Sequence, residues 1–167
     1  MTESQYIDLL IERYKKDWAT FTPEVKDGAV KEFQFLLEYS VKKSDKYPED
    51  LRFALVSGKI ANVLNTISET KKSDLFDISK KYGVRAINNA PGSEKGYQLL
   101  VEVFLLEGKF DTALKFAEMQ ANLNERVPEF HNLIIYIAKI KKDQKLIDEK
   151  MANARKFIPH YEYGLKR

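Results

Sequence analysis

The chain contains no cysteine, only seven glycines and five prolines, and no long hydrophobic run. Without cysteine it has no disulfide, no Cys-ligated zinc or iron–sulfur site and no thiol nucleophile. The low glycine and proline content excludes collagenous and low-complexity classes. The longest apolar stretches, at 103–106 and 133–138, are far shorter than the ~20 residues that cross a bilayer. These absences indicate a globular chain without a membrane span.

Charge and length narrow the class further. A chain of 167 residues is typical of one domain, or of a small domain with an appendage. The net charge is only +3, and the last forty residues carry nine basic and five acidic side chains. This bias is weaker than the basic stripe of a dedicated nucleic-acid binder, so nucleic acid is an unlikely partner. The first ten residues hold two acidic and no basic side chains, unlike a signal peptide, and we expect a cytoplasmic location.

Apolar residues recur three and four positions apart along nearly the whole chain, which predicts α-helices. Pro23, Pro48 and Pro128 each precede a glutamate, a pattern typical of the first turn of a helix. Together with the other breakers, these positions predict eight helices at about 3–19, 23–43, 48–70, 74–89, 94–107, 110–123, 128–141 and 144–157.

The predicted helices repeat with a period of 34 residues. Ala86 with Pro91 and Ala154 with Pro159 form the same helix ending two periods apart, and Gln120 occupies the intermediate position. On the first helix of each pair, this register aligns one apolar face in all three copies. A fixed period of this length is typical of stacked helix pairs, whereas a non-repetitive eight-helix bundle is the alternative.

The copy at 94–127 has a Gly-x-aromatic-x-x-Ala turn, Gly108 to Ala113, with Ala117 four residues further on. With the Ala-(four residues)-Pro endings, the sequence resembles the tetratricopeptide repeat (TPR) family over about residues 60–161, as three divergent repeats. The resemblance implies an all-α, TPR-like right-handed superhelix of about eight antiparallel helices. The domain prediction is an N-terminal helical hairpin acting as a cap, together with the start of the first repeat helix (1–59), three repeats (60–161) and a short tail (162–167).

The common catalytic, phosphate-binding and metal-binding motifs are all missing from the sequence. Of the two histidines, His131 falls in a slot that faces the partner helix, which favours a structural role, and His160 lies in the tail. We therefore predict no catalytic residue, no cofactor and no metal ligand. An enzyme with a dispersed site stays an alternative, as does a nucleic-acid-associated protein that uses the C-terminal lysines.

In the TPR family, the first helix of each pair lines a concave groove that holds a peptide or a partner helix, and the resemblance implies the same use here. The residues predicted to line this groove are Leu64, Asn65, Ser68, Lys71, Gln98, Leu99, Glu102, Leu105, Asn132, Leu133, Tyr136 and Lys139. The predicted function is a non-catalytic adaptor, scaffold or chaperone-type module that binds an amphipathic segment of a protein partner.

The helix at 144–157 is the last of the predicted stack, and its apolar stripe is wide. An apolar patch of this kind is usually covered. Two outcomes are expected: a homodimer through the C-terminal helix, or docking of the tail at 161–163 back over this face.

Overall fold

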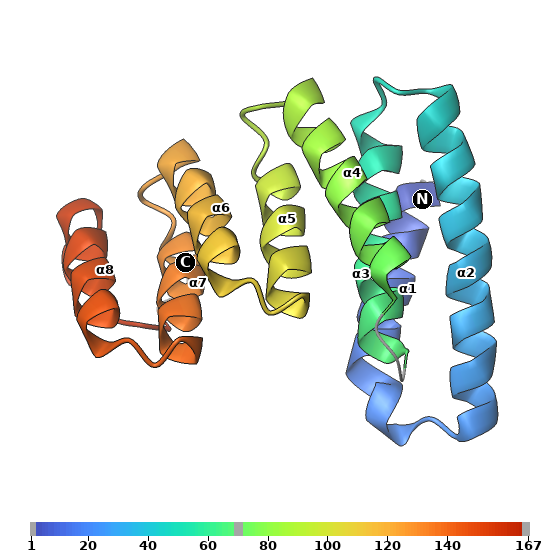
Figure 1. Cartoon of the computed structure of the whole chain (residues 1–167), viewed down its shortest axis with the longest axis horizontal. Helices are drawn as coiled ribbons and strands as arrows, with labels where there is room; N and C mark the ends of the chain where they lie inside the picture. Colours follow the sequence, from blue (N-terminus) through green and yellow to red (C-terminus); the bar gives the residue numbers. More distant parts are fainter. Residues whose placement is uncertain (1–2, 69–71, 165–167) are drawn as a thin grey trace. The chain divides into compact units, whose positions relative to one another are not determined.

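The structure is a computed structural model of the chain, and it describes residues 3–68 and 72–164. Within these ranges the regular structure consists of eight α-helices and one short 3₁₀ helix, without a strand (Figure 1). The helices are α1 (Glu3–Asp17), η1 (Trp18–Thr20), α2 (Pro23–Lys46), α3 (Leu51–Ile67), α4 (Ser73–Asn89), α5 (Glu94–Leu106), α6 (Phe110–Leu123), α7 (Pro128–Ile140) and α8 (Gln144–Phe157). The predicted all-helical class and the number of helices are confirmed.

Local signals place most helix ends. Pro23 and Pro128 stand at the first position of α2 and α7, as predicted. The Thr22 hydroxyl accepts a hydrogen bond from the Val25 amide at 3.4 Å. At the start of α8, the Asp143 carboxylate accepts one from the Leu146 amide at 2.9 Å. Each cap satisfies an N–H group that has no partner within its own helix.

The prediction that Pro48 begins a helix is wrong. Helix α2 continues to Lys46, and residues 47–50 form a turn in which the Asp50 amide donates to the Tyr47 carbonyl at 3.0 Å. The Asp50 carboxylate then caps α3 by accepting from the Arg52 amide at 3.0 Å. A side-chain cap outweighs the conformational preference of Pro48 here, because proline also suits turns. Helix α3 ends at Ile67, and predicted helical residues 69 and 70 lie outside the described ranges.

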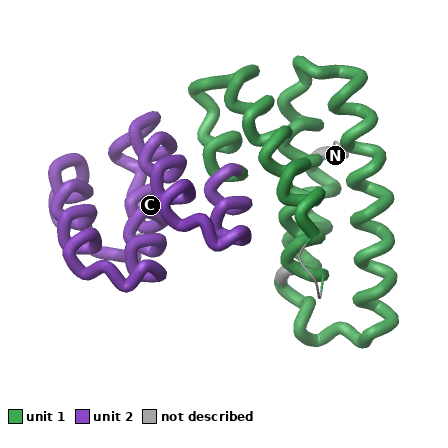
Figure 2. Tube along the Cα trace, viewed as in Figure 1, with its two compact units in different colours: residues 1–99 green, residues 100–167 purple. Residues whose placement is uncertain are grey.

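The chain divides into two compact units, residues 1–99 and 100–167, with the boundary inside α5 (Figure 2). In the first unit, α3 packs against α1, α2 and α4. The main apolar core of this unit consists of Ile7, Leu10, Ile11, Phe33, Leu37, Val56, Ile60, Ala61, Val63, Leu64 and Leu75. Because α3 touches three other helices, almost its whole circumference is buried.

Polar contacts join α2 to α4 at one end of the first unit. The Arg85 guanidinium donates to the Ser44 carbonyl at 3.0 Å and to the Asp45 carboxylate at 3.1 Å, and the Tyr82 hydroxyl donates to the same carboxylate at 3.1 Å. Burial raises the pKa of Asp45, but these hydrogen bonds outweigh burial and hold the pKa below its ordinary value. These hydrogen bonds hold α2 and α4 together.

In the second unit, α7 packs against both α6 and α8. The central core of this unit consists of Val101, Ala113, Ala117, Ala121, Phe130, Ile134 and Ile137. The alanines of α6 let α7 approach closely, and the Phe104 and Phe116 rings stack beside them with centroids 5.5 Å apart.

Burial follows the predicted period of 34 residues. Ala86, Gln120 and Ala154, one period apart, are exposed by 0, 2 and 0% of their surface. Val63, Tyr97 and His131, which are one period apart on the first helices, are buried as well. Small or buried groups at a fixed spacing are what stacked helix pairs need, because each pair buries its apolar face only against its neighbours.

Two glycines provide a test of the packing around α3. A Cβ at Gly58 would overlap the buried Leu99 side chain, whereas a Cβ at Gly28 in α2 would meet nothing within 4 Å. We expect Gly58→Ala to lower the free energy of unfolding by about 1–3 kcal/mol through overpacking. Gly28→Ala is expected to raise it by about 0.5–1 kcal/mol, because alanine favours the helix. Chemical denaturation measures both, and a stabilising Gly58→Ala would show that Leu99 does not lie against α3.

Candidate functional site

The structure separates the residues predicted to line a groove into groups of different exposure. Gln98, Tyr136 and Lys139 are exposed, while Ser68, Glu102, Leu105, Asn132 and Leu133 are half-buried. Leu64, Asn65 and Leu99 are each only 2% exposed. Lys71 lies outside the described residues. The predicted surface position is therefore wrong for the three buried residues.

Each of the three buried residues has an internal role. Leu64 belongs to the core of the first unit. Leu99 packs with Leu55 and Ala86. The Asn65 side-chain oxygen accepts a hydrogen bond from the Lys72 amide at 2.9 Å and so ties α3 to the start of α4. Helical spacing placed these residues beside the packed stripe. Leu64 and Asn65 are buried because α3 has neighbours on several sides, and Leu99 of α5 is buried because it packs against Gly58 of α3.

Helix α7 does present a polar stripe at its surface. Asn132, Tyr136 and Lys139 are separated by four and three residues and so lie on one side of the helix. Ile134, Ile135, Ile137 and Ala138 of the same helix are buried. The Tyr136 side chain is 47% exposed. We call Asn132, Tyr136 and Lys139 the α7 face, and it is the candidate binding surface of the second unit.

The chain itself already touches this face. After α8, residues 158–164 run back beside α7, where the C-terminus lies in Figure 1. The Tyr161 hydroxyl donates to the Asn132 side-chain oxygen at 2.7 Å, and the Gly164 amide donates to the same oxygen at 2.8 Å. The Lys139 ammonium lies 3.6 Å from the centre of the Tyr163 ring. Tail docking was one of the two outcomes expected for this end of the chain; the tail does dock, but Tyr163 lies on α7 instead of on the apolar stripe of α8.

Tyr161 is the fixed point of the tail. Its side chain is 1% exposed and packs with Ile135 of α7 and Ala154 of α8. Ile147, Met151 and Ile158 complete this cluster. Burial, followed by the nearby Tyr163, raises the pKa of Tyr161 to about 12. The sequence contained one signal for this contact, an aromatic residue just beyond a helix with an uncovered stripe.

His131 lies on the buried side of α7. Its Nε2 is 2.8 Å from the Glu125 carbonyl oxygen, and because a carbonyl can only accept, Nε2 carries the hydrogen. The ring stacks on Phe157 and meets the edge of Tyr161, with centroid distances of 6.4 and 5.9 Å. These contacts give His131 a packing role between α7, α8 and the tail.

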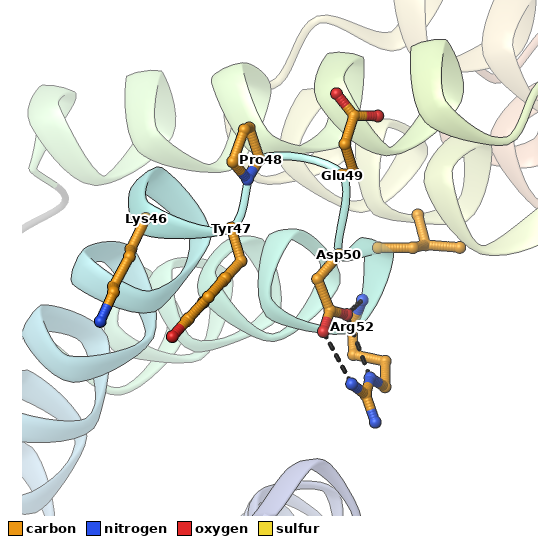
Figure 3. Close-up of a pocket in the computed structure, with 7 residues that line it drawn as sticks. Lys46, Tyr47, Pro48, Glu49, Asp50 and Arg52 are labelled. Atoms are coloured by element: carbon orange, nitrogen blue, oxygen red, sulfur yellow. Dashed lines mark hydrogen bonds and ion pairs between the residues drawn. The ribbon is translucent and has the colours of Figure 1, made fainter.

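Two hollows lie away from the α7 face. The first, of about 600 Å³, is lined by Lys46–Arg52, which comprise the turn between α2 and α3 and the adjoining helix ends (Figure 3). In it, the Asp50 carboxylate is bound by the Arg52 guanidinium at 2.7 Å, and the hydrogen bond from Arg52 lowers the pKa of Asp50. All seven lining residues are consecutive in sequence, so this hollow does not bring together groups from distant parts of the chain.

The second hollow, of about 350 Å³, is lined by residues of α6, α7 and α8. Lys150 on its wall pairs with Glu118 at 2.8 Å, and this hydrogen bond raises the pKa of Lys150.

Across residues 3–68 and 72–164, histidine and acidic side chains do not gather into any group of three that could hold a metal ion. Within the same ranges, every helix is too short or too polar to cross a membrane.

No family model matches the chain, and no curated protein matches it either. Several solved structures do. A thermophilic TPR protein of Thermus thermophilus superimposes with a TM-score of 0.61 at 15% identity, covering 92% of this chain and 82% of that one. MamA (41-end) from Desulfovibrio magneticus RS-1 superimposes with a TM-score of 0.60 at 12% identity, covering 94% of this chain and 96% of that one. MamA MSR-1 superimposes with a TM-score of 0.58 at 16% identity, covering 92% of this chain and 95% of that one. The chain has a TPR-like helical-repeat fold, which confirms the resemblance seen in the sequence.

The raised pKa of Tyr161 predicts a loss of stability at high pH. The folded-state pKa of about 12 lies above the ordinary tyrosine value of about 10, so folding favours the neutral phenol. Its contribution is complete below about pH 10 and disappears as the pH rises towards 12. Compared with Tyr161→Phe, the wild type should be more stable by about 1 kcal/mol at neutral pH. This difference should fall and then change sign over that interval, because the two pKa values differ by the equivalent of about 2.7 kcal/mol. Denaturation of both proteins across this pH range is the measurement, and a constant difference would contradict the buried position of Tyr161.

Proposed function

We propose that this chain is a non-catalytic protein-binding adaptor that holds an amphipathic segment of a partner protein against the α7 face. The observation that carries the proposal is the half-exposed Tyr136 ring between Asn132 and Lys139, on a helix whose other side is buried. The TPR-like fold supports it, because helical-repeat proteins use the extended surfaces of their stacked helices for binding.

The chemistry of the α7 face suits a polypeptide with an apolar side and an acidic group. Tyr136 offers a large flat ring, and aromatic residues are frequent anchors at protein interfaces. The Asn132 amide is able to bond a peptide backbone, as it does to the Gly164 amide of the chain itself. Lys139 supplies a positive charge at the end of the stripe. This set matches a peptide segment better than a small metabolite, which needs an enclosing pocket.

Two of the C-terminal lysines contact other parts of the chain, which weakens the nucleic-acid alternative. Lys139 faces the Tyr163 ring, and Lys141 pairs with Asp111 of α6. A phosphate-binding surface needs a row of cations that are available to a backbone. The chaperone role, the homodimer and the cytoplasmic location stay predictions of the sequence.

Two tyrosines of almost equal exposure allow a matched test. Tyr136 is 47% exposed on α7, and Tyr47 is 46% exposed in the turn after α2. We expect Tyr136→Ala to reduce capture of the native protein partner at least about tenfold, the effect of losing an interface anchor. Tyr47→Ala should leave capture unchanged. Both melting temperatures should stay close to that of the wild type, because exposed substitutions change stability by only about 0.5 kcal/mol.

Quantitative capture from native lysate at low and high salt is the measurement. A partner held by an apolar and amide surface should remain bound as the salt concentration rises. A steep loss of capture with salt would instead indicate phosphate contacts. Equal capture by the two alanine variants would show that the α7 face is not the binding surface.

A further inference from the structure

The end of the chain consists of a buried anchor followed by an exposed strap. Tyr161 is the anchor, held in the apolar cluster between α7 and α8. Residues 162–164, which we call the strap, are exposed. The strap lies on the α7 face through the Gly164 amide and the Tyr163 ring. Because the anchor is fixed without the strap, the strap is able to leave the face while Tyr161 stays in place.

The strap uses the same groups that a partner segment would use. The Asn132 side-chain oxygen has two lone pairs, of which one accepts from the Tyr161 hydroxyl and the other from the Gly164 amide. A backbone N–H from a partner can therefore bond this oxygen only after the Gly164 amide leaves. The Lys139 ammonium is likewise covered by the Tyr163 ring. Strap and partner exclude each other at two points.

The conformation of Gly164 shows that the strap is specific. Its φ of +95° lies in the left-handed region that residues with a Cβ rarely adopt. The contact thus depends on an aromatic residue followed directly by glycine, Tyr163-Gly164.

We propose that the strap is a displaceable internal occupant of the α7 face, and that the partner segment that replaces it has the same chemistry. Such a segment is extended, places an aromatic ring on Lys139 and follows it with a residue whose backbone N–H reaches Asn132. This inference rests on the proposed function, since it names the partner segment for the same face. Only molecules with the strap released bind the partner, so the measured affinity equals the intrinsic affinity reduced by the released fraction.

The test uses the full-length chain and a capped peptide with the strap sequence, acetyl-Glu-Tyr-Gly-amide. The released variant is Tyr163→Ser with Gly164→Pro, in which proline has no N–H to donate and cannot adopt a positive φ. Tyr161 is retained, so the anchor and the fold are preserved, which circular dichroism verifies. Peptide binding is followed by NMR titration of the ¹⁵N-labelled proteins. We expect the released variant to bind the peptide roughly tenfold more tightly than the wild type, as for a face that the strap occupies about nine-tenths of the time.

Two further variants locate the peptide. In the released background, Lys139→Ala should weaken peptide binding. Lys46→Ala should not, although Lys46 makes the same kind of contact with the Tyr47 ring, 5.2 Å away, in the first unit. In the wild type, saturation with peptide should move the Gly164 amide resonance towards its random-coil position, because the peptide takes its place on Asn132.

Several outcomes would overturn the inference. Equal peptide affinity of the wild type and the released variant would show that the strap does not compete. Absence of binding to both would show that the face does not accept such a segment, and dimerisation of the wild type through exchanged tails would make a second copy the occupant. The proposed function is judged separately, because Tyr136→Ala weakens native-partner capture whether or not the strap peptide binds.

Discussion

The burial of Tyr161 between α7 and α8 is the contact on which the candidate site depends. Helix α8 carries an apolar stripe that includes Ile147, Met151 and Ala154, and a wide apolar surface is seldom left exposed to water. In this chain an aromatic side chain from the tail fills part of that stripe, with Ile135 on one side and Ala154 on the other. Its hydroxyl would be costly to bury alone, and the Asn132 amide accepts its hydrogen bond. The end of the stack and the α7 face are thus joined through one residue.

This arrangement gives Asn132 of α7 a structural role. Asn132 holds the tail in place, because its oxygen receives both the Tyr161 hydroxyl and the Gly164 amide. In the proposed function, the same oxygen accepts a hydrogen bond from the bound peptide. In this proposal, both the stability of the second unit and access to the candidate site depend on the Asn132 side chain, because the strap binds to it.

The first unit shows the opposite case, in which packing removes a predicted surface. Helix α3 touches α1, α2 and α4, and Leu99 lies against its Gly58. A helix surrounded in this way has no exposed stripe to offer, so Leu64 and Asn65 serve the core and the α3–α4 turn. The likeness to TPR structures at 12–16% identity follows the same logic, because the fold requires a spacing of small and large residues and tolerates many identities at each position.

The sequence by itself determined the helices, their order and the period of 34 residues, because helical periodicity and caps are local properties of the chain. It also placed Tyr136 and Lys139 on one side of α7, and both are exposed in the structure. Only the tertiary structure decided which residues of each stripe reach the surface: Leu99 is buried and Tyr136 is exposed, although both lie beside the packed stripe of a first helix. Likewise, Asp50 caps the start of α3 while Pro48 lies in the preceding turn, and the tail contacts Asn132, 29 residues upstream of Tyr161. Burial depends on neighbours that are distant in sequence, and no local pattern contains them.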